Sequence, residues 1–384
     1  MRQLFFRCLG ATALLFAASC SNEPDLGKSD PYLSDDTAVV TISLGVEGRT
    51  QTRAEGQPAI SDGTRATTLI YAIYNNKGDL VKITNPNYKS EEETPTEDRL
   101  VTRAKIDGIE FPHELPAFEL VKGLEYTMVF WAQSENGDTY YDTSDLKNIQ
   151  VKYENAANND ELRDAFCARY TLILSQSDND KEVTITLKRP FAQINVGFTK
   201  AGYELMKSHS TNGDITKSSI TVKNVSNLFD LYSNNVGTAS VNIVDAEYAV
   251  SATPSTMEID GSTLGQYLQV DIDNNGQIAD TEEFVWLSMC YILAPDQNNG
   301  TSTYRTTVDI SNLKFYYEDG SEYETDLEEI PFVPVQRNHR TNILFDPANK
   351  TTLLLHLDPN YDEDDSNIRN DQDSEDNWSD NSGN

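Results

Sequence analysis

The sequence predicts an all-β protein built from two β-sandwiches in series, with one or two short helices. Short runs rich in Val, Ile, Thr, Tyr and Phe recur along the chain, and turns rich in Asn, Asp and Gly separate them. Strand and helix patterns do not alternate as they do in parallel α/β folds, and no short repeat of fixed length is present. The stretch from Thr37 to about Leu357 is long enough for two domains of ordinary size.

Each expected strand is an apolar or β-branched run that ends at a turn signal. Such runs predict strands at residues 38–46, 67–75, 126–133, 182–199, 219–225, 304–320 and 351–358. One helix is predicted at residues 158–170, NNDELRDAFCARY. There Leu162, Ala165 and Phe166 share one helical face after an Asn/Asp cap.

Residues 1–19 have the features of an export signal peptide. Arg2 and Arg7 supply a positive charge, and GATALLFAA, residues 10–18, supplies a short apolar core. This core is too short to cross a bilayer as a helix, and no other run in the sequence approaches the necessary length. The cysteine that follows has two interpretations, a lipid attachment site or a chance residue after an ordinary signal peptide.

Residues 17–20, AASC, resemble the lipobox of bacterial lipoproteins, in which the cysteine is acylated and becomes the mature N-terminus. Ala17 stands where Leu is more usual. The resemblance implies a lipoprotein with acyl chains such as palmitate on Cys20, followed by a linker over residues 20–36. Each buried acyl CH₂ contributes about 0.8 kcal/mol, so several chains hold a protein on a membrane. SNEPD, residues 21–25, resembles the surface-export tag of Bacteroides-type lipoproteins, which implies the outer membrane and exposure at the cell surface.

The net charge of −32 argues against two classes of partner. Phosphate groups are bound by Lys and Arg, so we expect no nucleic acid partner. Adsorption to an anionic membrane through a basic face is disfavoured for the same reason. Residues 358–384 carry ten acidic residues and one basic residue, so we expect residues 359–384 to be a disordered acidic tail. Cys167 and Cys290 lie in apolar surroundings, and we favour two buried thiols over a disulfide.

Several motifs resemble the fimbrillin-like surface lipoproteins of Bacteroides-type bacteria, which are relatives of the type V pilins. They are LKRPFAQINV at residues 187–196, SSITVKNV at residues 218–225, and VQRNHRTNIL at residues 335–344, which LHLDPNYD follows. The resemblance covers nearly the whole mature chain. It implies two tandem transthyretin-like β-sandwiches, one over residues 37–197 and one over residues 198–358, in a cell adhesion protein of the fimbrium.

In polymerising members of that family, the precursor is cut after an arginine that follows the first strand, and the strand of another subunit fills the vacated groove. The corresponding residues here are strand 38–46 and Arg49, Arg53 and Arg65. The alternative is that these arginines lie in a solvated loop and that the first strand never leaves. An acidic tail would be costly to bury in a groove, which argues against a position in the shaft and leaves a tip, anchor or stand-alone surface role open.

The stretch DIDNNGQIADTEEF, residues 271–284, matches the EF-hand loop pattern D-x-[DN]-x-[DN]-G-x5-E. Its expected Ca²⁺ ligands are the side chains of Asp271, Asp273, Asn275 and Glu282 and the backbone carbonyl of Gln277. Aromatic and β-forming residues flank the loop, so the pattern indicates a structural calcium site between two strands and not a helical sensor. The alternative is an Asn/Asp/Gly turn of matching composition.

The sequence contains no G-x-S-x-G motif, P-loop or G-x-G-x-x-G motif, and its four histidines lie in unrelated contexts. We therefore expect no enzymatic activity. The first function hypothesis is a lipid-anchored fimbrillin-like structural or adhesive protein, which includes a pilus subunit assembled by strand exchange. Its partners would be other fimbrillin-like subunits or ligands on host or bacterial surfaces. The second hypothesis is a non-enzymatic surface lipoprotein that binds glycans.

Overall fold

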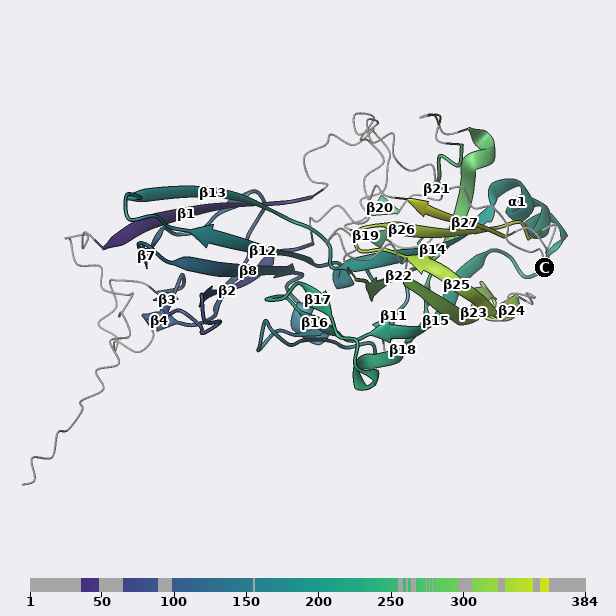
Figure 1. Ribbon diagram of the computed structural model, residues 1–384. Helices are drawn as coiled ribbons and strands as arrows, with labels where there is room; N and C mark the ends of the chain where they lie inside the picture. The colour runs from purple at the N-terminus through teal and green to yellow at the C-terminus, as the bar shows by residue number, and fades with distance from the viewer. Residues whose placement is uncertain are drawn as a thin grey trace, which may run out of the picture.

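The computed structural model shows an elongated molecule in which two groups of β-sheets lie end to end (Figure 1). The structure describes residues 36–47, 65–88, 99–154, 156–254, 258–259, 262–263, 267–273, 275, 277, 279–295, 306–323, 329–347 and 353–358. The predicted signal peptide at residues 1–19, Cys20, Arg49, Arg53 and the predicted acidic tail at residues 359–384 lie outside these ranges.

The first group of sheets is built from the N-terminal part of the chain, up to Leu187. The elements of this part are β1 (Thr37–Val46), β2 (Thr68–Asn75), β3 (Ile83–Thr84), β4 (Leu100–Val101), β5 (Ala104–Asp107), β6 (His113–Glu114), β7 (Phe118–Val121), β8 (Glu125–Gln133), the 3-10 turn η1 (Gly137–Thr139), β9 (Tyr141–Asp142), β10 (Ile149–Val151), β11 (Ala156–Ala157), the 3-10 turn η2 (Glu161–Arg163), β12 (Phe166–Ile173) and β13 (Asp180–Leu187). Of these, β9 and β10 form a sheet with two later strands and β11 pairs with another later strand, so these three lie in sheets of the C-terminal part. One sheet has the order β13-β1-β6, with β7 also on β1, and the facing sheet has the order β12-β8-β2-β5.

The second group belongs to the C-terminal part, from Phe191 onward. Its elements are β14 (Phe191–Thr199), α1 (Lys200–His209), β15 (Ile215–Ser226), β16 (Leu228–Asp230), β17 (Asn235–Val236), the 3-10 turn η3 (Ser240–Asn242), β18 (Ile243–Ala252), β19 (Glu258–Ile259), β20 (Ser262–Thr263), β21 (Tyr267–Gln269), the 3-10 turn η4 (Asp280–Glu282), β22 (Glu283–Leu293), β23 (Thr306–Tyr317), β24 (Glu322–Tyr323), β25 (Glu329–Val335), β26 (Arg340–Phe345) and β27 (Leu353–Asp358). β14 is central, since it pairs with β22 antiparallel and with β26 in parallel.

Strand β1 follows the period-2 pattern that its sequence predicts. Its residues alternate between half-buried and buried positions along the whole strand. Ala38, Val40, Ile42, Leu44 and Val46 point into the N-terminal core and are at most 5% exposed. Because side chains of a strand alternate between its two faces, the polar residues between them lie on the outer face.

Strands β2 and β8 are buried on both faces, because their sheet lies between two hydrophobic cores. In β2, Leu69, Tyr71 and Ile73 belong to the N-terminal core, together with β1. The alternate residues Ile70 and Tyr74 belong to the second core, which continues into the C-terminal part. Strands buried on both faces read as continuous apolar runs, as TLIYAIYN does here. The sheet is therefore a wall that both cores share.

Trp131 of β8 packs this shared sheet against aromatic residues of the second core. Its ring centroid lies 5.2 Å from that of Tyr141, 6.2 Å from that of Phe229 and 6.3 Å from that of Phe191. The indole N–H donates to Oε1 of Gln133 at 2.8 Å, which satisfies the polar atom of this buried side chain. The short strands β9 and β10 contribute Tyr141, Ile149 and Val151 to the same core and form one sheet with β16 and β17.

The prediction of an all-β protein with few helices is confirmed, and each predicted strand is present with small changes of boundary. The run at residues 182–199 is two strands, because Lys188, Arg189 and Pro190 interrupt it. β14 belongs to the large C-terminal sheet, whereas the sequence analysis placed residues 191–197 in the N-terminal sandwich. The last change from the N-terminal sheets to the C-terminal sheets therefore comes at residues 188–190, a few residues earlier than predicted, and the short strands β9, β10 and β11 already pair with C-terminal strands before it.

The helix prediction at residues 158–170 is wrong. Asp160 does cap a turn, since its side chain accepts a hydrogen bond from the backbone N–H of Leu162, but only the 3-10 turn η2 forms. Asp164 then adopts an extended conformation, and Phe166 begins β12, which pairs with β8 over eight residues. Burial of Phe166 in the N-terminal core outweighs the local helical pattern.

The described residues contain one α-helix, α1, which the sequence analysis missed. The hydroxyl group of Thr199 accepts a hydrogen bond from the backbone N–H of Gly202 and caps its first turn. Lys207 and His209 lie in its last turn, where positive charge is favourable. The signals were therefore present, but Gly202 and the polar composition of the segment concealed them.

Candidate functional site

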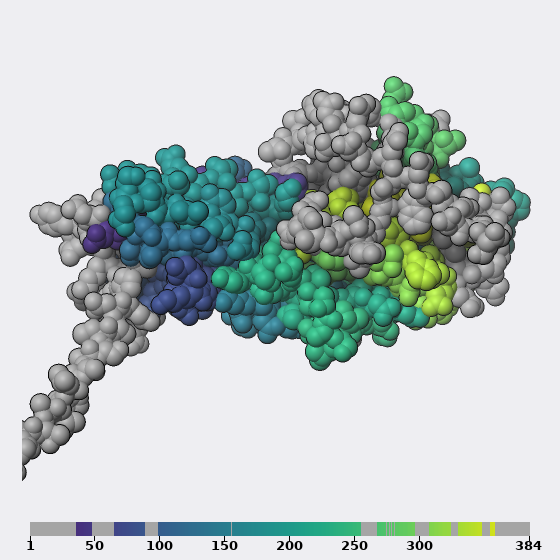
Figure 2. Space-filling view, viewed as in Figure 1, coloured from purple at the N-terminus to yellow at the C-terminus, as the bar shows by residue number. Residues whose placement is uncertain are grey.

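Strand β1 occupies an internal position in its sheet. On one side it pairs in parallel with β13, from Val39 opposite Asp180 to Val46 opposite Leu187. On its other side it pairs antiparallel with β7 along its first half and with β6 along its second half. On the face shown in Figure 2, the purple atoms of the N-terminal strand are visible only as small patches, because neighbouring strands cover it. Without β1, β13 and β7 would border an empty slot.

The end of β1 is held by the segment between the two parts of the molecule and by the turn between β25 and β26. The carboxylate of Glu47 lies 2.9 Å from Nζ of Lys188 and accepts a hydrogen bond from Nδ2 of Asn338 at 2.5 Å. The backbone N–H of Glu47 donates to the carbonyl oxygen of Leu187 at 2.9 Å. These partners were missed in the sequence analysis, since Asn338 lies 291 positions from Glu47 and no local pattern joins them.

Of the three arginines proposed as cleavage sites, the structure describes only Arg65. It lies in a turn three residues before β2, half-buried, and its backbone carbonyl accepts a hydrogen bond from the N–H of Thr67. The segment between β1 and β2 thus re-enters the described structure at Arg65. Cleavage at any of the three positions would separate β1 from the rest of the chain.

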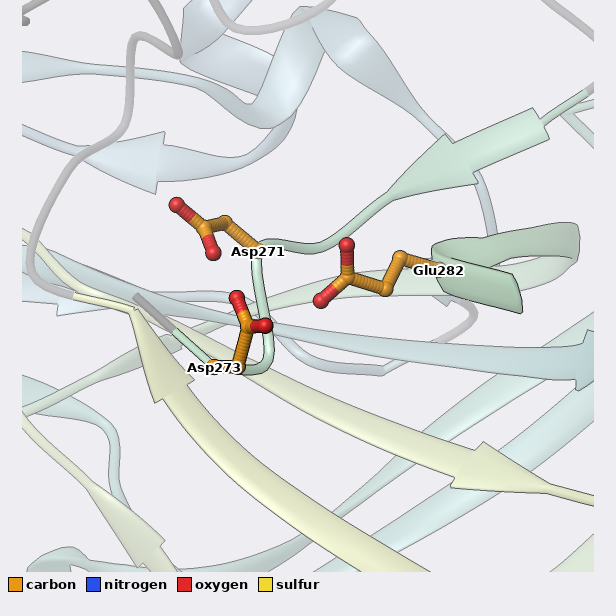
Figure 3. A group of neighbouring side chains, drawn as sticks. All are labelled: Asp271, Asp273 and Glu282. Carbon is orange, nitrogen blue, oxygen red and sulfur yellow. The ribbon is translucent and has the colours of Figure 1, made fainter. Parts of the chain in front are cut away.

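The predicted calcium loop connects two paired strands. β21 and β22 are antiparallel neighbours, with Leu268 opposite Phe284, so the loop closes a β-hairpin. Asp271, Asp273 and Glu282 each bring a carboxylate oxygen within 4.8 Å of the others. Glu282 extends from η4 toward the segment that carries Asp271 and Asp273 (Figure 3). The prediction that β elements flank this loop is confirmed.

Hydrogen bonds within the loop hold its carboxylates in place. The backbone N–H of Asn275 donates to Oδ1 of Asp271 at 3.0 Å and to Oδ1 of Asp273 at 3.2 Å. Glu282 is 6% exposed, and its two carboxylate oxygens accept the backbone N–H groups of Ile272 and Ala279, each at 2.8 Å. A carboxylate oxygen has two lone pairs, so each can still coordinate a cation.

The spacing of these oxygens fits the size of Ca²⁺. Oxygen ligands lie about 2.3–2.6 Å from Ca²⁺, so two ligands of one ion are at most about 5.2 Å apart. The value of 4.8 Å for the three carboxylates falls within this limit. Oδ1 of Asn275, the next predicted ligand in the loop, accepts the backbone N–H of Gln277 at 2.8 Å and keeps a second lone pair for a cation. Asp271, Asp273 and Glu282 are the three carboxylates that would hold the ion.

Other reactive side chains in the described residues do not form a comparable group. Asp271, Asp273 and Glu282 are the one cluster of three or more potential metal ligands found there. Cys167 and Cys290 are buried and not joined in a disulfide, as predicted, and burial raises the pKa of Cys290 far above its usual range. Burial also lowers the pKa of His113. A buried neutral thiol is a poor nucleophile, so neither cysteine has the setting of a catalytic residue.

Comparisons with known proteins identify a family but transfer no function. The profile of the family described as "Family of unknown function (DUF6562)" matches residues 34–379. No curated protein matches the chain. Within the part of the chain that is described, no helix is long and apolar enough to span a bilayer.

Solved structures of low similarity include three with related names. The tip fimbrial protein Mfa3 from Porphyromonas gingivalis is 10% identical, with a TM-score of 0.38, over 84% of this chain and 98% of that chain. A candidate cell adhesion protein from Parabacteroides distasonis is 10% identical, with a TM-score of 0.41, over 84% and 97%. A candidate polysaccharide-binding protein from Bacteroides thetaiotaomicron is 10% identical, with a TM-score of 0.38, over 81% and 93%. Likeness at this level does not carry a function from one protein to another.

Proposed function

Because the chain belongs to a family of unknown function, DUF6562, we propose a function from its own residues: a lipid-anchored cell-surface structural or adhesive protein that assembles by exchange of strand β1. The observation that carries this proposal is the internal position of β1 between β13 and β7. β1 is also the first described strand, so a single cut in the segment that follows it would release it.

If β1 left and no strand replaced it, the N-terminal part would lose too much folding free energy to stay folded. Val40, Ile42, Leu44 and Val46 are each at most 5% exposed. Burial of one such side chain contributes about 1.5–3 kcal/mol, so the four together contribute roughly 6–12 kcal/mol. This sum is comparable to the total stability of a typical domain, about 5–15 kcal/mol. The released N-terminal part therefore either unfolds or accepts a replacement strand.

A replacement strand must reproduce the pattern of β1. Backbone groups of β13 and β7 would supply the hydrogen bonds, and alternate apolar side chains would fill the core positions. A shift of register by one residue would turn the apolar side chains to the polar face, so the pattern selects the incoming segment. Another fimbrillin-like subunit is the partner that this chemistry fits.

Limited digestion of the folded mature protein with an Arg-specific protease tests strand exchange. We expect a ladder of oligomers that survives SDS in unboiled samples, because exchanged strands are integrated into a core. An excess of a synthetic peptide of residues 37–46 should suppress the ladder by filling the slot. The matched control replaces Arg49, Arg53 and Arg65 with Lys, which the protease does not cut, and should stay monomeric. Digestion that yields only a truncated monomer, or a ladder in the control, would contradict the proposal.

The lipid anchor is a separate part of the proposal and rests on the sequence alone, since Cys20 lies outside the described residues. Mass spectrometry of the native protein should find an acylated Cys20 at the mature N-terminus. A Cys20→Ser variant should lose the lipid and leave the membrane fraction. An unmodified N-terminus at another residue would remove the anchor from the proposal.

We also propose that Ca²⁺ binds the loop of Asp271, Asp273 and Glu282 in a structural role. When bound, the ion offsets two of the three negative charges of the neighbouring carboxylates and fixes the turn that joins β21 to β22. EF-hand loops of extracellular modules bind Ca²⁺ with dissociation constants of about 10⁻⁴–10⁻³ M, so a weak site is filled outside the cell. The fixed hairpin extends the large sheet beside β22.

A further inference from the structure

Two bulges lie at the same level on the outer face of the sheet formed by β18, β15, β23 and β25. In the first, Lys223 and Asn224 of β15 lie opposite the single residue Asp245 of β18. In the second, Pro331 and Phe332 of β25 lie opposite Asp309 of β23, since the register shifts between Val308 and Ile310. Lys223 pairs with Asp309 across β15 and β23, so the two bulges are neighbours.

Both bulges are built in the same way. Asn224 has a φ of 64°, and its backbone N–H donates to Oδ1 of Asp245 at 3.3 Å. Phe332 has a φ of 58°, and its backbone N–H donates to Oδ1 of Asp309 at 3.0 Å. The left-handed backbone region is tolerated by Asn and disfavoured for a bulky residue such as Phe. An Asn would therefore form the second bulge with less strain, as Asn224 does in the first.

The ring of Phe332 does not compensate for this strain by packing in the core. The side chain is 75% exposed, whereas Val333 beside it in the strand is fully buried. Backbone strain of this kind concentrates at functional sites, and here it coincides with an aromatic ring that projects into solvent. The ring is therefore placed for a contact outside the molecule.

The residues that the strand register places beside Phe332 on the outer face are polar. Nζ of Lys223 donates to Oε1 of Glu329 at 3.0 Å, and Nδ2 of Asn224 donates to Oδ2 of Asp309 at 3.4 Å. A stable protein interface buries about 800 Å² on each partner around an apolar centre, and one ring among charged side chains does not supply it. Pro331 and Pro334 lack N–H groups, which disfavours the addition of a strand at β25.

From this arrangement we propose that Phe332 and the adjacent bulge form a binding site for a neutral hexose unit of a glycan. One face of a pyranose ring carries C–H groups, which suit the electron-rich face of an aromatic ring. Its hydroxyl groups can donate to the carboxylates of Asp309 and Glu329 and accept from Lys223 and Asn224. Because carboxylates outnumber the single cation here, an anionic sugar is disfavoured. This site goes beyond strand exchange and does not depend on it.

Calorimetric titration and saturation-transfer NMR of the full mature chain test the site, with maltohexaose, cellohexaose and mannohexaose as probes. We expect at least one probe to bind and Phe332→Ala to weaken that binding about tenfold or more. Phe332→Asn should weaken it equally without a decrease in melting temperature, because Asn suits the backbone. Ile173→Ala is the matched control, since Ile173 is also an exposed apolar residue, at 64%, and should leave binding unchanged.

Three results would overturn the proposal: no binding of any probe, equal binding by Phe332→Ala, or equal loss in the Ile173→Ala control. Sedimentation velocity of the same variants supplies a further readout. If Phe332→Ala instead dissociates a self-associated protein, the ring contacts a second copy of the chain. The protease-induced ladder should form normally in Phe332→Ala, so failure of the glycan site and failure of strand exchange are distinguishable.

Discussion

Asp164→Asn is expected to destabilise the protein strongly, because it removes the counterion of a buried arginine. Nε of Arg189 lies 2.9 Å and 3.1 Å from the two carboxylate oxygens of Asp164, and Nη2 lies 3.0 Å from one of them. The side chains of Arg189 and Asp164 are 0% and 4% exposed. The guanidinium group also lies 4.4 Å from the ring centroid of Phe166. Arg189 precedes β14, so this pair fixes the segment that joins the two parts.

The expected loss follows from burial. Removal of one member of a buried ion pair costs about 3–5 kcal/mol, since it leaves a charge in a medium that solvates it poorly. An exposed pair contributes about 0–1 kcal/mol. Lys314 and Glu322 form such a pair at 3.0 Å with side chains 44% and 47% exposed, so Glu322→Gln is the matched control.

Urea unfolding followed by tryptophan fluorescence measures both variants. A double variant, Asp164→Leu with Arg189→Met, should be less destabilised than Asp164→Asn alone, because it buries no charge. The reasoning is refuted if Asp164→Asn costs no more than Glu322→Gln, or if the double variant is the less stable of the two.

Three further predictions concern β1, the calcium loop and the buried thiol. Ile42→Ala should lower the free energy of unfolding by about 2–5 kcal/mol in urea titrations, since it leaves a cavity in the N-terminal core. A decrease as small as that caused by an Ile→Ala change at an exposed position would contradict this prediction. Addition of about 2 mM Ca²⁺ should stabilise the chain by about 1.8 kcal/mol for a dissociation constant of about 0.1 mM. Thermal melts should show this gain, and Asp273→Asn or a chelator should abolish it. Burial raises the pKa of Cys290. The thiol therefore stays neutral in the folded state at pH values at which it ionises in the unfolded chain. Stability should therefore decrease as pH rises above about 8.5, and Cys290→Ala should reduce that decrease in urea titrations at about pH 7.5 and about pH 9.5.

Local patterns were sufficient to predict the strands and the setting of the calcium loop. The alternation of residues 38–46 specified both the existence and the inward face of β1. β-forming residues on either side of the loop predicted that it joins two β elements, which are β21 and β22; that the two strands pair as a hairpin is a finding of the structure. In both cases the signal is contained within about ten neighbouring residues, which is the range over which side-chain periodicity acts.

Features that depend on tertiary contacts were not predictable in this way. The segment at residues 158–170 has an apolar pattern and a cap that suit a helix, but pairing with β8 makes Phe166 part of a strand. The exposure and left-handed backbone of Phe332 could not be predicted from its local sequence, because both follow from a bulge opposite Asp309 on another strand. The hydrogen bond between Glu47 and Asn338 joins residues that only the folded chain brings together.

The wall formed by β12, β8, β2 and β5 determines how the molecule responds to a pulling force. Domains joined by a flexible linker hinge freely, but a large apolar interface suppresses such motion. Here residues of β2 and β8 belong to the cores on both sides of one sheet. A load applied at one end of the elongated body (Figure 1) is therefore transmitted through shared side chains, and we expect the protein to resist bending between its two parts.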